Sequence, residues 1–183
     1  GDALTTATES VALGSNSLGA NTEGTANTAL GAYALRNDTL GSRSVAVGHQ
    51  ALNAQNFTSA TSAYNVAVGA NAGVAVTTGI QNTLIGGLAG DALTDADYNV
   101  AVGVSALTSD TLGSKSTAIG SGSLAAQNFT TATDVYNTAV GFYAGIGITT
   151  GINNTLIGGL AGDALTDADD NVAVGLNALT ADT

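Results

Sequence analysis

The 183-residue sequence contains no cysteine, proline, methionine or tryptophan, and its only aromatic residues are five tyrosines and three phenylalanines. Without cysteine, disulfide scaffolds, thiolate metal sites and cysteine nucleophiles are excluded. A single histidine leaves zinc chemistry short of ligands. No segment approaches the roughly 18 consecutive apolar residues that a membrane-spanning helix needs. A core must therefore be built from alanine, valine, leucine and isoleucine.

Basic residues are also scarce. Arg36, Arg43 and Lys115 stand against 14 acidic residues, which gives a formal net charge of −11. Nothing in such a chain neutralises a row of phosphates, so nucleic acids and anionic membrane surfaces are excluded as partners.

The dominant feature of the sequence is a short unit that occurs ten times. Each unit begins with Asn or Ser, continues with three residues such as Val-Ala-Val, and then has a glycine. The recurring glycines are Gly14, Gly31, Gly48, Gly69, Gly86, Gly103, Gly120, Gly141, Gly158 and Gly175, and all gaps between them are equal except for two longer ones. The leading asparagines are Asn27, Asn65, Asn82, Asn99, Asn137, Asn154 and Asn171. A fixed period of this kind predicts a repeat architecture.

Four units form a larger repeat, in which Gly14 corresponds to Gly86 and Gly86 to Gly158. The two longer gaps contain related inserts at 53–64 and 125–136, and residues 82–97 are identical to residues 154–169. We therefore interpret residues 1–183 as a single repeat array. Because neither end shows a capping repeat, we expect the array to be a segment of a longer fibre.

The residues before each recurring glycine alternate in size. In the unit at 99–103, the two valines lie on one face of a strand and the alanine on the other. A unit is long enough for two short strands and two turns, the second strand following the Ala-Leu pair. We predict an all-β fold, a repetitive parallel β-roll (β-solenoid) of about ten coils of about 17–21 residues. The flat alanine face is expected to let other copies of the chain approach closely.

The ten units resemble the head repeats of trimeric autotransporter adhesins, whose motif runs Ser/Asn-Val-Ala-Ile-Gly. The unit at 137–145 is also similar to repeats in bacteriophage tail fibres. The resemblance covers essentially the whole chain and implies a left-handed parallel β-roll, intertwined or packed as a homotrimer. Head repeats are usually a little shorter than the units of this chain and lack the two inserts. The resemblance assigns no receptor-binding residue, because the matching positions are structural.

Three sets of residues are candidates for a role beyond the repeat itself. The leading asparagines are interpreted as structural, bonding one another or their own turns. The inserts contain Phe57, Tyr64, Phe129 and Tyr136, which are candidate contacts for a partner because aromatic residues dominate binding hot spots. A threonine recurs twelve positions after the leading residue, at Thr22, Thr39, Thr77, Thr94, Thr111, Thr149, Thr166 and Thr183. One regular threonine per coil fits a strand-to-turn role better than a flat ice-binding array.

Carboxylates gather in two related segments, at Asp91, Asp95 and Asp97 and at Asp163, Asp167 and Asp169. Alternating aspartates are a weak candidate for a calcium site, but the spacing of an EF-hand and of calcium-binding rolls is absent. A solvated acidic turn is the favoured interpretation, and no metal or other cofactor is predicted. Because the chain has a single histidine, it offers few groups suited to acid–base catalysis, so an enzyme is not expected.

These features together predict a structural fibre or adhesin segment, a shaft or head. It would project from a cell surface or a virion tail fibre and support attachment to an unknown surface receptor or glycan. We expect an extracellular location, a homotrimer, and no membrane insertion of this segment. Two alternatives remain: a self-assembling extracellular filament whose chains join end to end, and a monomeric cation- or ice-binding solenoid.

Overall fold

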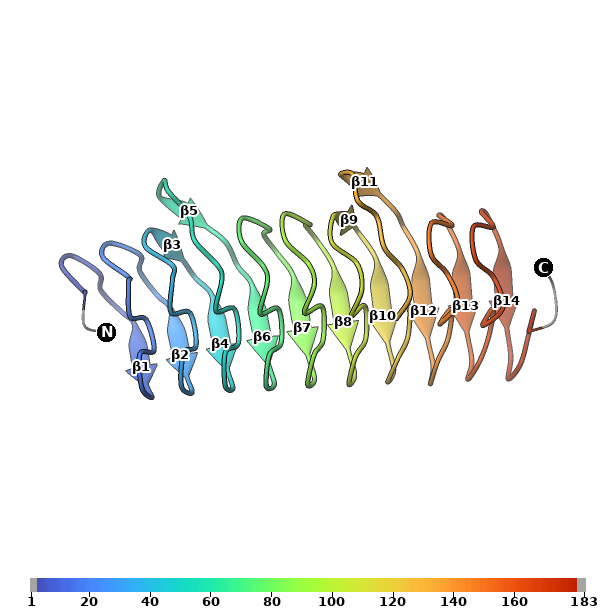
Figure 1. Cartoon of the computed structure of the whole chain (residues 1–183), viewed down its shortest axis with the longest axis horizontal. Helices are drawn as coiled ribbons and strands as arrows, with labels where there is room; N and C mark the ends of the chain where they lie inside the picture. The colour runs from blue at the N-terminus through green and yellow to red at the C-terminus, as the bar shows by residue number, and fades with distance from the viewer. Residues whose placement is uncertain (1–2, 181–183) are drawn as a thin grey trace.

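The computed structural model describes residues 3–180, which form a parallel β-solenoid of about ten stacked coils (Figure 1). Each coil contributes one three-residue strand to a single ten-stranded sheet. Its strands are β1 (Val11–Leu13), β2 (Thr28–Leu30), β4 (Val45–Val47), β6 (Val66–Val68), β7 (Thr83–Ile85), β8 (Val100–Val102), β10 (Thr117–Ile119), β12 (Thr138–Val140), β13 (Thr155–Ile157) and β14 (Val172–Val174). Residues 3–180 contain no helix. Consequently none of these residues belongs to a helix capable of crossing a lipid bilayer.

Neighbouring strands pair in parallel, and each repeat position lies opposite its own equivalent. Ala118 of β10 is the partner of Ala101 on one side and of Ala139 on the other. At about 4.8 Å per strand, ten such strands extend about 45 Å along the axis. The sequence period is therefore also a spatial period.

The strands turn their small residue inward, so the expected use of the alanine face is wrong. Ala101 of β8 is fully buried inside its coil, whereas Val100 and Val102 are partly exposed on the outside. Leu107 of the same coil is also fully buried and belongs to the same core cluster. Beside an inward leucine the narrow coil leaves room for a methyl group on the strand. The flat alanine face is thus part of the core and is closed to other copies of the chain.

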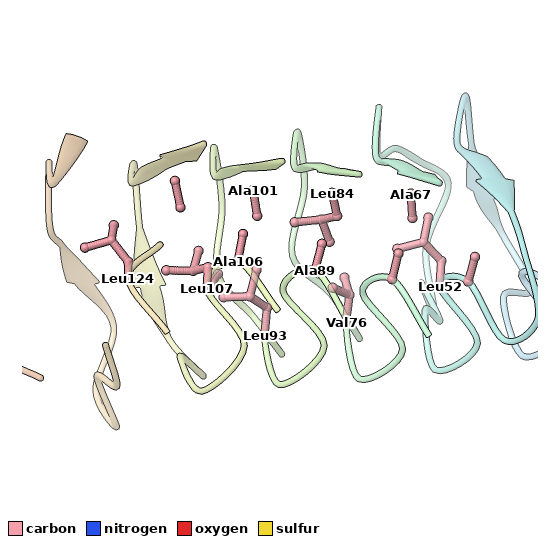
Figure 2. Close-up of a cluster of buried hydrophobic side chains, with 14 of the residues drawn as sticks. Leu52, Ala67, Val76, Leu84, Ala89, Leu93, Ala101, Ala106, Leu107 and Leu124 are labelled. Carbon is pink, nitrogen blue, oxygen red and sulfur yellow. The ribbon is translucent and has the colours of Figure 1, made fainter. Parts of the chain in front are cut away.

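The core is a single column of small and medium apolar side chains between the strands and the returning chain (Figure 2). Three arrangements fill it. Most coils pair an alanine on the strand with a leucine further along, as with Ala101 and Leu107. β7 instead has the buried Leu84 on the strand, and Gly90 stands where the leucine would be. β6 and β12 have alanine on the strand and a glycine, Gly73 or Gly145, at the leucine position, and leucines of the adjacent coils fill the space beside these glycines.

The recurring glycine is required where the strand turns into the next segment. Gly103 has a φ of +140°, in the region that L side chains rarely adopt. A Cβ at this position would also lie 2.5 Å from the carbonyl carbon of Gly120 in the next coil. Both the conformation and the contact between coils therefore exclude a side chain.

Additional strands occur only beside the two inserts, which corrects the expectation of a second strand in every coil. β3 (Gly41–Ser42) pairs with β5 (Thr61–Ser62), and β9 (Gly113–Ser114) pairs with β11 (Thr133–Asp134). Elsewhere in the described chain the segment after the Ala-Leu pair consists of turns and bends. β5 and β11 stand out from the rod on the same side in Figure 1.

Candidate functional surfaces

The leading asparagines hold the coils together from inside. Nδ2 of Asn99 donates to the carbonyl oxygen of Gly113 in the same coil (2.9 Å), and Oδ1 accepts from the N–H of Ser116 in the next coil (2.9 Å). Asn99 itself is fully buried, and its own N–H donates to Oδ1 of Asn82. The same bond to the own turn recurs at Asn27, Asn65, Asn82, Asn137 and Asn154. This column is part of the framework and offers no surface to a ligand.

A buried polar cluster anchors each insert, and the sequence analysis did not identify it. In the first insert, Oδ1 of Asp38 accepts from the N–H groups of Gly41 (3.0 Å) and Phe57 (3.2 Å). Oδ2 accepts from Nε2 of Gln55 (2.6 Å), whose Oε1 accepts from Asn65 (2.9 Å). Asp110 and Gln127 repeat the arrangement in the second insert. The available signal was the segment Asp-Thr-Leu-Gly-Ser before each insert coil together with the shared Ala-Gln-Asn-Phe within it.

The four aromatic residues predicted as partner contacts divide into two groups. Phe57 and Phe129 are buried against the rod and are not available to a partner. Tyr64 and Tyr136 are 53% and 54% exposed. Only the tyrosines therefore remain as surface candidates.

Tyr64 and Tyr136 each lie beside a basic residue of the preceding coil. The Arg43 guanidinium carbon lies 5.7 Å from the ring centroid of Tyr64, and Nη1 of Arg43 donates to Ser62. Nζ of Lys115 forms an ion pair with Asp134 (2.5 Å) and donates to the hydroxyl of Tyr136 (3.2 Å). The hydrogen bonds to Asp134 and Tyr136 raise the pKa of Lys115, so the amine stays protonated at neutral pH. These contacts tie the base of each insert to the neighbouring coil.

The recurring threonines form a ladder along the turn opposite the sheet. The hydroxyl of Thr94 donates to the carbonyl oxygen of Thr111 in the next coil (3.1 Å), and Thr149 does the same to Thr166 (3.1 Å). The N–H of Thr94 also donates to Thr111 (2.9 Å). The threonines therefore bond the coils to one another. Thr183 lies outside the described residues.

Four of the six aspartates in the acidic turns bond to neighbouring coils, whereas Asp167 accepts from Thr166 of its own coil (3.1 Å). Oδ1 of Asp91 accepts from the Thr108 hydroxyl (2.5 Å), and Oδ1 of Asp95 accepts from Thr78 (2.6 Å). Oδ1 of Asp97 accepts from the N–H of Ile80 (2.8 Å). Within residues 3–180, no three acidic or histidine side chains converge as a metal site would require. Asp163, Asp167 and Asp169 lie in the second copy of this turn, where Asp169 likewise accepts from Ile152 (2.8 Å).

Burial raises the pKa of the Asp97 carboxyl. The hydrogen bond from Ile80 opposes this shift, and the nearby charge of Asp95 adds to it. A half-buried carboxylate is thus placed next to a second one in a turn that has no basic residue of its own.

The outside of the main sheet is an apolar surface that runs along the rod. We call the residues at the third position of its ten strands the outer aliphatic column: Leu13, Leu30, Val47, Val68, Ile85, Val102, Ile119, Val140, Ile157 and Val174. Even within the rod, Leu30, Ile85 and Ile119 are 41%, 38% and 39% exposed. None of the ten strands contains a charged residue. Exposed apolar patches that run the length of a molecule are typical of protein interfaces.

Tyr33, Phe142 and Tyr143 follow a recurring glycine and so lie at the other end of the strands from Tyr64 and Tyr136. Tyr33 and His49 make an edge-on contact with ring centroids 6.0 Å apart, and Phe142 and Tyr143 lie side by side at 3.9 Å. Phe142 is exposed.

Comparison with known proteins supplies no relative for any of these surfaces, because no family model, curated protein or solved structure matches the chain.

Proposed function

We propose that this chain is a structural segment of an extracellular fibre or adhesin, a shaft or head that assembles as a homotrimer. It would project from a cell surface or a virion tail fibre and support attachment there. The role is mechanical: stacked coils hold binding groups away from the surface at regular intervals. The outer aliphatic column is the observation that carries the proposal.

Two properties of this column support association of like chains. It is continuous over ten strands, so it offers a partner a contact about 45 Å long. It is also uncharged in a chain with a net charge of −11, so copies can meet along it without bringing like charges together. A rod-shaped partner of the same length and repeat fits such a surface along its whole extent, and a second and third copy of this chain have that shape.

The molar mass of the purified chain, measured by light scattering at several concentrations, tests the proposal. We expect about three times the chain mass of 17.7 kDa, independent of concentration. Ile119→Lys places a charge in the middle of the outer aliphatic column and should give monomers. Thr150→Lys is the matched control, because it adds the same charge at an exposed turn away from the sheet, and should remain trimeric.

A monomeric wild-type chain would contradict the proposal and favour a solitary solenoid. A mass that rises without limit would favour an end-to-end filament. Equal behaviour of Ile119→Lys and Thr150→Lys, with both variants folded by circular dichroism, would show that the column is not the interface.

A further inference from the structure

Three of the five tyrosines occupy one corner of the rod. The residue directly before each leading Asn or Ser forms this corner. The backbone of this residue has a positive φ in every described coil. In order along the rod the corner residues include Arg43, Tyr64, Gln81, Tyr98, Lys115, Tyr136 and Asn153, with φ between 53° and 65°. Tyr64, Tyr98 and Tyr136 are therefore two coils apart from one another. With equal backbone conformation and exposures of 53%, 47% and 54%, they form a row that we call the tyrosine ridge.

Contacts with Arg43 and Lys115 give Tyr64 and Tyr136 a structural role, so stability of the coil leaves tyrosine unexplained at Tyr98. A positive φ is costly for a bulky side chain, and asparagine or glycine adopts it more easily. Asn153 has the same conformation (φ 59°) in a later coil, so the fold accepts asparagine there. About half of each tyrosine side chain remains in solvent, which limits the stabilisation that its burial contributes. Strained residues that the fold does not need are candidates for function.

The spacing of the ridge restricts what can bind along it. Two coils correspond to about 9.6 Å. An extended strand presents the same face about every 6.6–6.8 Å, and an α-helix repeats about every 5.4 Å, so neither is in register with successive tyrosines. In a β-1,4-linked glycan every second sugar turns the same ring face in the same direction, and this repeat is close to the distance between two coils.

Of the two corner residues between the tyrosines, Lys115 is bonded to Asp134 and Tyr136, whereas Gln81 fits the same ligand. Gln81 is exposed between Tyr64 and Tyr98, and Asn153 is exposed after Tyr136. Amide side chains both donate and accept hydrogen bonds, as sugar hydroxyls do. Tyrosine supplies an apolar ring with a polar tip. The net charge of −11 disfavours a strongly anionic polysaccharide.

We propose that Tyr64, Tyr98 and Tyr136 form a binding ridge for an extended, neutral β-1,4-linked glycan, with sugars stacked on alternate coils and hydrogen-bonded in between. This inference names a ligand class for the attachment role and in that respect rests on the proposed function. A polyproline II peptide has a repeat of about 9.3 Å and is the nearest competitor. Such peptides bind in aromatic-lined grooves, whereas the ridge is a corner of the rod.

Calorimetric titration with cellohexaose tests the ridge. Tyr98→Asn removes the middle ring and keeps a residue suited to the positive φ, so the melting temperature should not fall. Loss of one stacked ring should weaken binding about tenfold. Tyr143→Asn is the matched control: Tyr143 is an exposed tyrosine with a φ of 57° at a different corner, and its replacement should leave affinity unchanged. Maltohexaose, whose α-1,4 linkage curls the chain, should bind more weakly than cellohexaose.

Several results would overturn the ridge. These are no binding of cellohexaose at millimolar concentration, equal affinity of the wild type and Tyr98→Asn, and preferential binding of a decaproline peptide. Light scattering on the same samples separates this proposal from the previous one. A trimer that binds no cellohexaose contradicts the ridge alone, and a monomer that binds it contradicts the trimer alone. A lower molar mass for Tyr98→Asn would assign the ridge to the interface between copies and overturn its role in glycan binding.

Discussion

Leu84 fills the space beside Gly90: a Cβ on Gly90 would lie 2.7 Å from Cδ2 of Leu84. The next coil has the opposite arrangement, with the small Ala101 on the strand and the large Leu107 at the position of Gly90. Leu107 has a φ of 55° and Gly90 a φ of 56°, so a leucine can adopt the backbone found at Gly90. Leu84 also fills the space beside Gly73 of the preceding coil, where a Cβ would lie 2.6 Å from its Cδ1, so its volume serves two coils.

Exchange of this pair should be tolerated only when both residues change. Leu84→Ala leaves a cavity and is expected to cost about 2–5 kcal/mol, and Gly90→Leu overpacks the coil at a cost of about 1–3 kcal/mol. The double variant recreates the arrangement of Ala101 and Leu107 and should recover part of the loss, because the space that Leu84 fills beside Gly73 of the preceding coil stays empty. Urea unfolding of the three variants gives the coupling energy. Additive effects of the two single changes would contradict the volume argument.

Asn99→Ala should separate two coils locally. The carbonyl oxygen of Gly113 and the N–H of Ser116 would lose their partners inside the rod, at about 1–3 kcal/mol for each unsatisfied group. Amide hydrogen exchange at Ser116 should become faster, while amides four coils away keep their protection. Thr58→Ala, at an exposed insert position, is the control and should change neither. Unchanged exchange at Ser116 in Asn99→Ala would mean that the asparagine column does not hold the coils.

Asp38→Ala should release the first insert and leave the second in place. Three donors lose their acceptor, namely the N–H groups of Gly41 and Phe57 and the amide of Gln55. Limited proteolysis followed by mass spectrometry should find the first cleavage within residues 57–62. The second insert, anchored by Asp110, serves as an internal control in the same molecule. Simultaneous cleavage of both inserts would indicate global unfolding.

The raised pKa of Asp97 predicts a specific pH dependence. The folded chain retains the proton at pH values where the unfolded chain, with an ordinary aspartate pKa of 3.8, has lost it. Stability contributed by this group therefore falls as pH rises from 3.8 through the raised pKa of the folded state. Asp97→Asn keeps an acceptor for Ile80 and removes the charge. It should melt higher than the wild type at pH 7 and at about the same temperature at pH 3.

Glu23→Gln is the control for this titration, because Glu23 is exposed and its replacement removes one negative charge. It should leave the difference between pH 3 and pH 7 unchanged. If Asp97→Asn and Glu23→Gln shift the melting temperature equally, net charge explains the effect and burial of Asp97 does not.

The sequence predicted the solenoid and the number of its coils, because a glycine such as Gly103 is needed at the same point of every coil and so marks the period. It did not predict which strand face is buried. Alternation of Val100, Ala101 and Val102 defines two faces, and a period of two is satisfied with either face inside. The choice depends on Leu107, which enters the coil from the returning chain and leaves room only for alanine.

The inserts show a similar limit. Their sequence identified four aromatic residues but not the direction in which each one points. Phe57 is buried because its own N–H is bonded to Asp38, a residue 19 positions earlier whose carboxylate is inside the rod. Tyr98 was overlooked as a surface candidate because it lies outside the inserts. Its relation to Tyr64 and Tyr136 becomes visible only when the coils are stacked.

The buried residue near the end of each coil favours changes in the length of the array by a fixed number of coils. Asp38 and Gln55 are followed at this position by Val76 and Leu93, and the same order returns with Asp110, Gln127, Ile148 and Leu165. Loss of one coil of an Asp-Gln pair, or gain of a coil between its two members, would leave a buried carboxylate or amide without its partner. Gain or loss of four coils keeps each Asp-Gln pair together, although the first described coil has Asn21 where the later sets have Leu93 and Leu165. Duplication in whole sets of four coils is therefore the route by which such a rod can change its length and keep its interior intact.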